Sequence, residues 1–181
     1  MSAVPAPDSS PDAGAIWHYG DPFGEQRAAE HDAVVIDRSH RAVITLTGPD
    51  RQSWLHSISS QHVTALPDGA STEKNLSLDG QGRVEDHWVQ TELDGVTYLD
   101  TERERGEPLL AYLRKMVFWA DVTLEAADLA VLSLLGPRLA DPPAVLDVLG
   151  LDGLPAESFA VSVDGGFLRR VPSPAGQIEL D

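Results

Sequence analysis

The stretch LSLDGQGRVEDHWVQTELDGVTYLD, residues 76–100, decides the fold of this chain. It contains two turn signals, DGQG at residues 79–82 and DG at residues 94–95, between runs rich in strand-forming residues. An Asp-Gly pair favours a tight hairpin because glycine adopts a positive φ at little cost. The stretch therefore predicts a meander of three antiparallel strands.

Two acidic side chains fall on faces of these strands that their neighbours mark as buried. Side chains two residues apart share a face of a strand. Asp86 thus shares a face with Val84 and Trp88, and Asp100 shares a face with Tyr98. We interpret the two acids as lining one apolar surface.

A buried carboxylate needs a partner, because its removal from water costs several kcal/mol unless it is paired, hydrogen-bonded or in contact with a ligand. The partner of Asp86 is either a structural one, such as an arginine or backbone amides, or a ligand. Asp100 either caps the helix predicted to follow from Glu102 or also contacts a ligand. The residues alone leave both alternatives open.

Composition excludes several classes of function. The chain has 181 residues and a formal net charge of −16, and its basic residues are scattered, which argues against direct binding of nucleic acid. It has no cysteine, so disulfides and thiolate chemistry are absent. His56 and His62 are not spaced as ligands on one face, so we expect no metal. No leader or membrane-spanning run is visible, which predicts a cytoplasmic protein without membrane contact.

The chain divides into three predicted parts. Residues 1–15 are rich in Pro, Ser, Ala and Asp and predict a disordered tail. Residues 16–126 predict an N-terminal α+β domain, and residues 127–181 the start of a second α+β domain that looks truncated. Helices are expected over residues 24–33, from residue 49 and over residues 102–118. Further strands are expected over residues 34–36, 42–47, 119–125, 129–135, 159–163, 167–171 and 177–180.

A polar segment, Asp37 to Arg41, separates two strand-like runs and concentrates two arginines and a histidine. Loops at the ends of buried strands often carry binding sites. A solvated turn is the alternative.

Six phrases together carry a resemblance to a known family. The chain resembles the YgfZ family of folate-binding proteins, relatives of the glycine-cleavage T-protein (aminomethyltransferase), over residues 15–181. This resemblance implies an α+β, T-protein-like folate-binding fold with mixed or antiparallel sheets and flanking helices, and a second, ferredoxin-like domain that is incomplete at the C-terminus. The phrases are WHYGDPFGEQR (17–27), DRSHR (37–41), TGPDRQSWLHSISSQHV (47–63), GQGRVEDHWV (80–89), LLAYLRKMVFWADV (109–122) and LSLLGP (132–137).

The resemblance also implies a cofactor and its site. Asp86 matches the second acid of a T-protein pair that contacts tetrahydrofolate, and Asp100 falls where that family has an asparagine against the pterin. A carboxylate can accept two parallel hydrogen bonds from a pterin, whose flat ring needs an apolar slot. Glu85 and Gln90 depart from the T-protein pattern, which weakens the case for aminomethyl transfer. The folate-binding residues expected are Asp86, Asp100, Trp88, Tyr98, Glu85 and Asn75.

The function implied is that of a tetrahydrofolate-binding accessory protein that supports iron–sulfur enzymes, with those proteins as clients, and through them tRNA modification. One alternative is an aminomethyltransferase-like enzyme that transfers a one-carbon unit using tetrahydrofolate. A second is a non-catalytic scaffold module. The YgfZ signature KGCYxGQE contains a cysteine that this chain lacks. We therefore expect no turnover from these residues alone and assign no catalytic residue.

Overall fold

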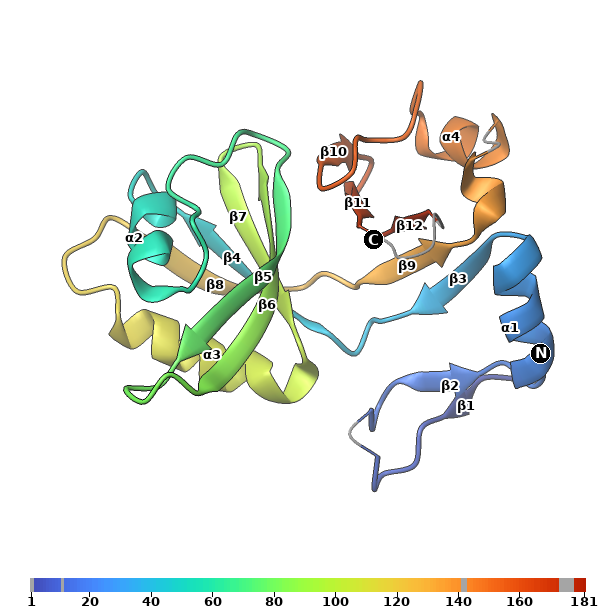
Figure 1. The fold of residues 1–181 in the computed structure, drawn as a ribbon, viewed down its shortest axis with the longest axis horizontal. Helices are drawn as coiled ribbons and strands as arrows, with labels where there is room; N and C mark the ends of the chain where they lie inside the picture. The colour runs from blue at the N-terminus through green and yellow to red at the C-terminus, as the bar shows by residue number, and fades with distance from the viewer. Residues whose placement is uncertain (1, 11, 141–142, 173–177) are drawn as a thin grey trace.

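The computed structural model describes residues 2–10, 12–140, 143–172 and 178–181. Over these residues the chain forms two five-stranded sheets, a two-stranded hairpin and several helices (Figure 1). All strand pairs in the two large sheets are antiparallel. The predicted α+β class is confirmed.

The first sheet contains the predicted meander and has the strand order β5-β6-β7-β4-β8. Glycine permits the reversal between β6 and β7, where Asp94 and Gly95 both adopt a positive φ. The strands are β4 (Ala42–Thr47), β5 (Ser71–Leu78), β6 (Val84–Leu93), β7 (Val96–Thr101) and β8 (Thr123–Ala127).

Two helices, α2 (Arg51–Ile58) and α3 (Arg103–Lys115), cover one face of this sheet (Figure 1). Their apolar stripes pack on the inward side chains of the strands, and burial of this apolar surface stabilises the unit. The core formed in this way consists of Ile44, Leu46, Trp54, Leu55, Val63, Trp88, Leu99, Leu109, Leu110, Leu113 and Leu124.

The second sheet has the strand order β10-β11-β12-β9-β3. Its last strand, β3, comes from the N-terminal part of the chain and pairs with β9. The division predicted between residues 126 and 127 therefore does not separate the two sheets, because β3 lies in the sheet formed by the later residues. The strands are β3 (Val34–Asp37), β9 (Leu132–Leu135), β10 (Ala160–Val163), β11 (Gly166–Val171) and β12 (Glu179–Leu180). Residue 177, predicted to begin the last strand, lies outside the described residues.

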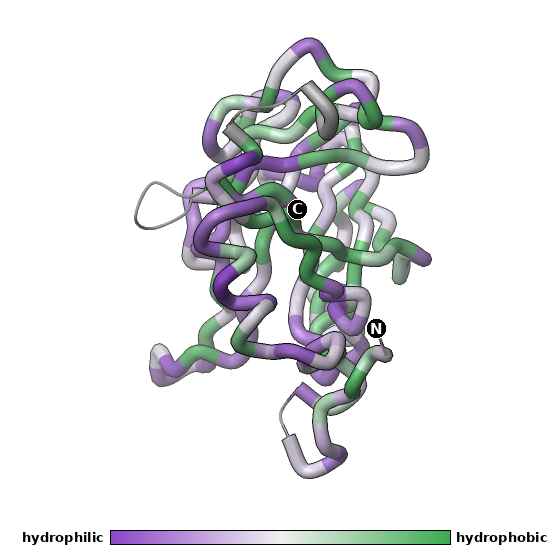
Figure 2. The backbone as a smooth tube through the Cα atoms, turned by 90° about the vertical axis from the view of Figure 1, so that its right-hand side faces the viewer, coloured by the Kyte–Doolittle hydropathy of each residue, from purple (hydrophilic) through white to green (hydrophobic). Residues whose placement is uncertain are grey.

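Three helical segments belong to this second unit. They are α1 (Pro22–His31), the 3₁₀ helix η1 (Pro137–Ala140) and α4 (Pro143–Leu149). The N-cap residue of α1 is Asp21, whose side chain accepts a hydrogen bond from the backbone N–H of Gly24. Figure 2 shows that hydrophilic and hydrophobic residues are interspersed along the backbone of the chain.

The N-terminal segment differs from the predicted disordered tail. Strand β1 (Val4–Pro5) pairs with β2 (Ile16–His18), and Ala6 and Ala15 are buried. Residues 1 and 11 of the predicted tail lie outside the described residues. The compositional argument missed this hairpin because backbone pairing can order a segment that has few large apolar side chains.

The strand predicted from residue 119 begins later, at Thr123. Between α3 and β8, Phe118 adopts a positive φ and Trp119 is 94% exposed. This aromatic pair belongs to a turn, although its composition favours a strand. Within the described part of the chain, none of the helices combines the length and apolarity needed to cross a membrane.

Candidate functional site: a cavity between the two sheets

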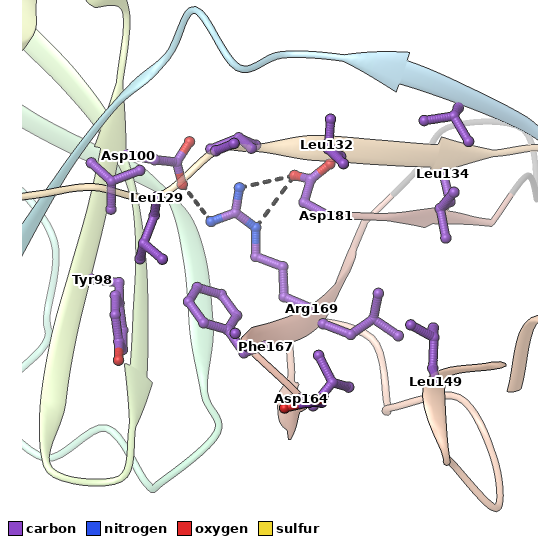
Figure 3. Close-up of a pocket in the computed structure, with 18 of the residues that line it drawn as sticks. Tyr98, Asp100, Leu129, Leu132, Leu134, Leu149, Asp164, Phe167, Arg169 and Asp181 are labelled. Atoms are coloured by element: carbon purple, nitrogen blue, oxygen red, sulfur yellow. Dashed lines mark hydrogen bonds and ion pairs between the residues drawn. The ribbon is translucent and has the colours of Figure 1, made fainter. Parts of the chain in front are cut away.

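A cavity of about 770 Å³ lies between the two five-stranded sheets. Its lining is mainly apolar (Figure 3). It comes from β4 and β7 of the first sheet, from β3, β9, β10 and β11 of the second, from α4 and from the neighbouring loops. The volume falls in the range of roughly 300–1,000 Å³ that is usual for small-molecule sites. Its apolar lining residues include Val35, Val43, Leu129, Leu132, Leu134, Leu149, Val163 and Leu168.

Two aromatic side chains face each other across the junction of the sheets. Tyr98 of β7 and Phe167 of β11 both line the cavity, with ring centroids 4.8 Å apart and an interplanar angle of 52° (Figure 3). Tilted pairs at this distance are favourable for aromatic rings. They offer a flat ligand an aromatic wall.

A buried charge cluster lies at one end of the cavity (Figure 3). Arg169 of β11 is only 4% exposed and donates through Nη1 to Asp100 Oδ2 and through Nη2, at 2.9 Å, to Asp181 Oδ2. Burial opposes the charge on Arg169, but the two carboxylates outweigh burial and raise the pKa of the guanidinium. The arginine therefore stays charged and joins one sheet to the other.

Asp100 is 4% exposed and is held by a second arginine as well. Arg41 donates from Nε to Asp100 Oδ1 at 2.8 Å and from Nη1 to Glu102 Oε1 at 2.5 Å. The polar segment before β4 thus supplies a half-buried partner to this site. Asp100 does not serve as the helix cap considered above, since Glu102 is the N-cap residue of α3.

The two acids do not share a surface, and this interpretation of the sequence is wrong. The tight turn pairs Leu93 with Val96 and consequently Val89 with Asp100. Directly opposed residues share a face of a sheet, whereas side chains alternate along a strand. Asp86 therefore points to the face that the helices cover, and Asp100 points to the cavity.

On the helix-covered face, Asp86 has structural partners. It is 5% exposed, accepts hydrogen bonds from Arg105 Nε at 2.7 Å and Ser77 Oγ at 3.1 Å, and is paired with Arg105 Nη2 at 2.6 Å. Arg105 is on α3 and its side chain is 44% exposed. The pair attaches the first turn of the helix to β6.

The other predicted site residues separate in the same way. Tyr98 lines the cavity with Asp100. Trp88 is fully buried in the core beneath the helices, and Asn75 is fully buried beside it and donates to the carbonyl of Thr72 at 2.9 Å. Glu85 is exposed on β6. The structure therefore brings Asp100 and Tyr98 together and places the rest elsewhere.

Sequence reasoning missed Arg169, Asp181 and Phe167. The sequence predicts a strand over residues 167–171, but nothing local shows which of its two arginines is buried. The available signal is that Phe167 and Arg169 lie two residues apart, so their side chains share one face of β11. Among the described residues, no group of three or more His, Asp or Glu side chains is placed to hold a metal ion.

A second cleft, of about 340 Å³, shares Asp100, Arg169 and Asp181 with the cavity but is lined mostly by charged residues. Glu73 of β5 lies in it. Burial raises the pKa of the Glu73 carboxyl. Glu179 and Asp181 add to the rise, while Arg169 and Lys74 oppose it.

The raised pKa of Glu73 predicts that this carboxyl lowers the free energy of unfolding in a pH-dependent way. Between the ordinary pKa of glutamate and the raised one, the folded state binds a proton that the unfolded state does not, so stability falls as pH rises through this window. Glu73→Gln is expected to increase the free energy of unfolding at pH 7 only slightly, by about 0.5 kcal/mol or less, because solvent screens this partly exposed carboxyl. Urea denaturation of the variant and the wild type, at pH 7 and at a pH below the ordinary pKa of glutamate, measures this gain. The gain should vanish at the lower pH, and a variant less stable than the wild type at pH 7 contradicts the prediction.

Comparison with curated proteins shows sequence similarity to aminomethyltransferases. The chain is 30% identical over 129 residues to the aminomethyltransferase of Chromobacterium violaceum and 29% identical over 123 residues to that of Pseudomonas syringae pv. tomato. Each match covers 67% of this chain and 34% of the relative. The matched region thus spans about a third of the length of these relatives. No family model matches the chain.

Comparison with solved structures identifies the fold. The glycine cleavage system aminomethyltransferase T from Bartonella henselae matches with a TM-score of 0.84 and 21% identity, over 99% of this chain and 49% of that one. A chain of the heterotetrameric sarcosine oxidase from Corynebacterium sp. U-96 matches with a TM-score of 0.51 and 15% identity, over 88% of this chain and 83% of that one. The chain has the aminomethyltransferase T fold, as predicted.

Proposed function

We propose that this chain binds a reduced folate, of the tetrahydrofolate type, in the cavity between the two sheets. The observation that carries the proposal is the combination in one cavity of an apolar lining, the Tyr98–Phe167 aromatic wall and a buried charge cluster. The fold shared with aminomethyltransferase T and the resemblance to folate-binding proteins support the same ligand.

The chemistry of a pterin fits these groups. Its flat ring gains from apolar and aromatic surfaces, and its amino group and ring N–H can donate to the free lone pairs of Asp100. Arg169 uses three of its five N–H groups on Asp100 and Asp181, which leaves two for pterin acceptors. In this proposal Asp100 and Tyr98 face the ligand, and Asp86, Trp88 and Asn75 support the strands behind it.

The proposed role is that of an accessory protein that supports iron–sulfur enzymes and, through them, tRNA modification. The state of Asp100 supports binding without turnover. Both of its oxygens accept hydrogen bonds from arginines, so it is poorly suited to abstract a proton. The cellular role follows from the family resemblance.

The similarity to curated aminomethyltransferases favours a second candidate, one-carbon transfer that uses tetrahydrofolate. A glycine-cleavage assay with a lipoyl carrier protein separates the two candidates. The accessory role predicts no folate-dependent turnover. Turnover above the protein-free rate would establish the transferase and contradict the accessory role.

Folate binding is tested by titration calorimetry of the chain with 5-formyltetrahydrofolate. Phe167→Ala is expected to weaken binding about tenfold or more, since stacking of a heterocycle on an aromatic side chain contributes about 1–3 kcal/mol. Phe23→Ala is the matched control, because this phenylalanine of α1 is exposed. We expect it to bind as the wild type does.

A third variant locates the ligand. Asp86→Asn should leave the affinity unchanged if the folate lies in the cavity, and should weaken it if the folate lies on the helix-covered face. Absence of wild-type binding, or equal loss in the two phenylalanine variants, contradicts the proposal.

A further inference from the structure

Strand β5 contains an irregularity at the polar cleft. Thr72 pairs with Gln90 and Asn75 pairs with Trp88, so Glu73 and Lys74 together stand opposite Val89. This two-against-one arrangement is a β-bulge, which bends a strand and redirects its side chains. Adjacent strand residues normally point to opposite faces, yet Glu73 and Lys74 both line the cleft.

Two neighbours hold the backbone of the bulge. The ring Nε2 of His87 lies 2.6 Å from the carbonyl oxygen of Glu73, and the Asn75 amide donates to the carbonyl of Thr72 at 2.9 Å. Bulges are common beside functional sites because they aim particular side chains. Here the side chains so aimed are one acid and one base.

The other charged groups of the cleft are paired with one another. Within the described residues, no ion pair within 4.0 Å involves Glu73 or Lys74, and the buried Oε1 of Glu73 has no hydrogen-bond partner. A buried carboxylate oxygen without a partner is costly, and a donor placed there would be favourable. The existing pairs are Arg38–Glu179, Arg41–Asp100, Arg169–Asp100 and Arg169–Asp181.

We propose that this cleft is a second binding site, for a small zwitterion of the α-amino acid class. The ligand ammonium group donates to Glu73, and the ligand carboxylate accepts from Lys74. One acid and one base that do not pair with each other are the complement of such a molecule, and charge-assisted hydrogen bonds at both ends supply the specificity. The cleft volume of about 340 Å³ accommodates it.

A single charge is less suited to the site. An anion alone would leave the buried Glu73 oxygen without a donor, and a cation alone would make no use of Lys74, an exposed base that lines the cleft. The inference rests on the cleft and the bulge and not on the folate proposal, so its test contains no folate. Failure of one proposal therefore leaves the other standing.

The test is a titration of the ¹⁵N-labelled chain with glycine, followed by ¹H–¹⁵N NMR. We expect saturable shifts at residues 72–75 and 87–89. Methylamine and acetate each carry only one of the two charges. Their dissociation constants should be at least about tenfold higher than that of glycine. Glu73→Gln and Lys74→Met should each weaken glycine binding to a similar extent.

Matched controls are Glu107→Gln and Lys115→Met, which change an exposed acid and the only other lysine of the chain, both on α3. These variants should bind glycine as the wild type does. The proposal is overturned if glycine gives no saturation at tens of millimolar. Undiminished binding in both cleft variants, or acetate binding as tightly as glycine, overturns it equally.

Discussion

Replacing Arg169 with methionine is expected to lower the free energy of unfolding by about 3–5 kcal/mol, the range measured when one partner of a buried ion pair is removed. The change leaves Asp100 with Arg41 alone, and it removes from Asp181 the partner that holds it beside Ser133. Both carboxylates would be nearly buried with fewer donors. The contact between the two sheets should weaken because these ion pairs are lost.

Urea denaturation followed by circular dichroism measures this loss. Arg138→Met is the control, because Arg138 and Asp32 form an exposed pair at 3.5 Å whose removal should cost about 1 kcal/mol or less. If Arg169→Met proved no more costly than Arg138→Met, the buried cluster would not join the two sheets.

Replacing Trp88 with alanine is expected to cost about 3–5 kcal/mol, as for other large aromatic residues removed from a core. Trp88 is fully buried between β6 and the helices, so a large cavity would remain. Trp88→Phe should cost much less, about 1.5 kcal/mol or less, since it keeps an aromatic ring. The indole N–H has no acceptor among the described residues, so its loss removes no hydrogen bond.

Trp119→Ala is the control for this pair, and its effect should stay within about 0.5 kcal/mol because the side chain is exposed. Thermal unfolding of the three variants gives the comparison. A Trp88→Ala protein as stable as the Trp119→Ala protein would show that Trp88 is not part of the core. It would also reopen the possibility that this residue contacts a ligand.

Much of the first sheet could be predicted from local sequence. The Asp-Gly turns, the alternation along β6 and the helical spacing in α3 each depend on residues close in the chain. The burial of Asp86 and Trp88 followed from the same alternation and is confirmed.

The relation between strands was harder to predict. Alternation places Asp86 and Asp100 correctly within their own strands. It does not show which faces of the two strands lie on the same side of the sheet, and the prediction that both acids line one surface is wrong for that reason. A two-residue turn at Asp94 would have determined the register and with it the opposite orientation. The sequence therefore contains a local signal for this orientation.

Long-range partners left no local signal. Nothing near Arg169 indicates that it meets Asp100, and nothing near Val34 indicates that β3 pairs with β9. Such contacts depend on how the two sheets are assembled in space, which alternation and turn chemistry do not specify.

The β3–β9 pairing has a consequence for biosynthesis. Every strand of the first sheet is translated after β3 and before β9, so the ribosome delivers a complete meander while Val34–Ile36 still lacks its neighbour. Closing so long a loop is entropically costly and slow. Nascent chains should therefore pass through a stage in which one half is native and an apolar edge remains open to chaperones or to other chains.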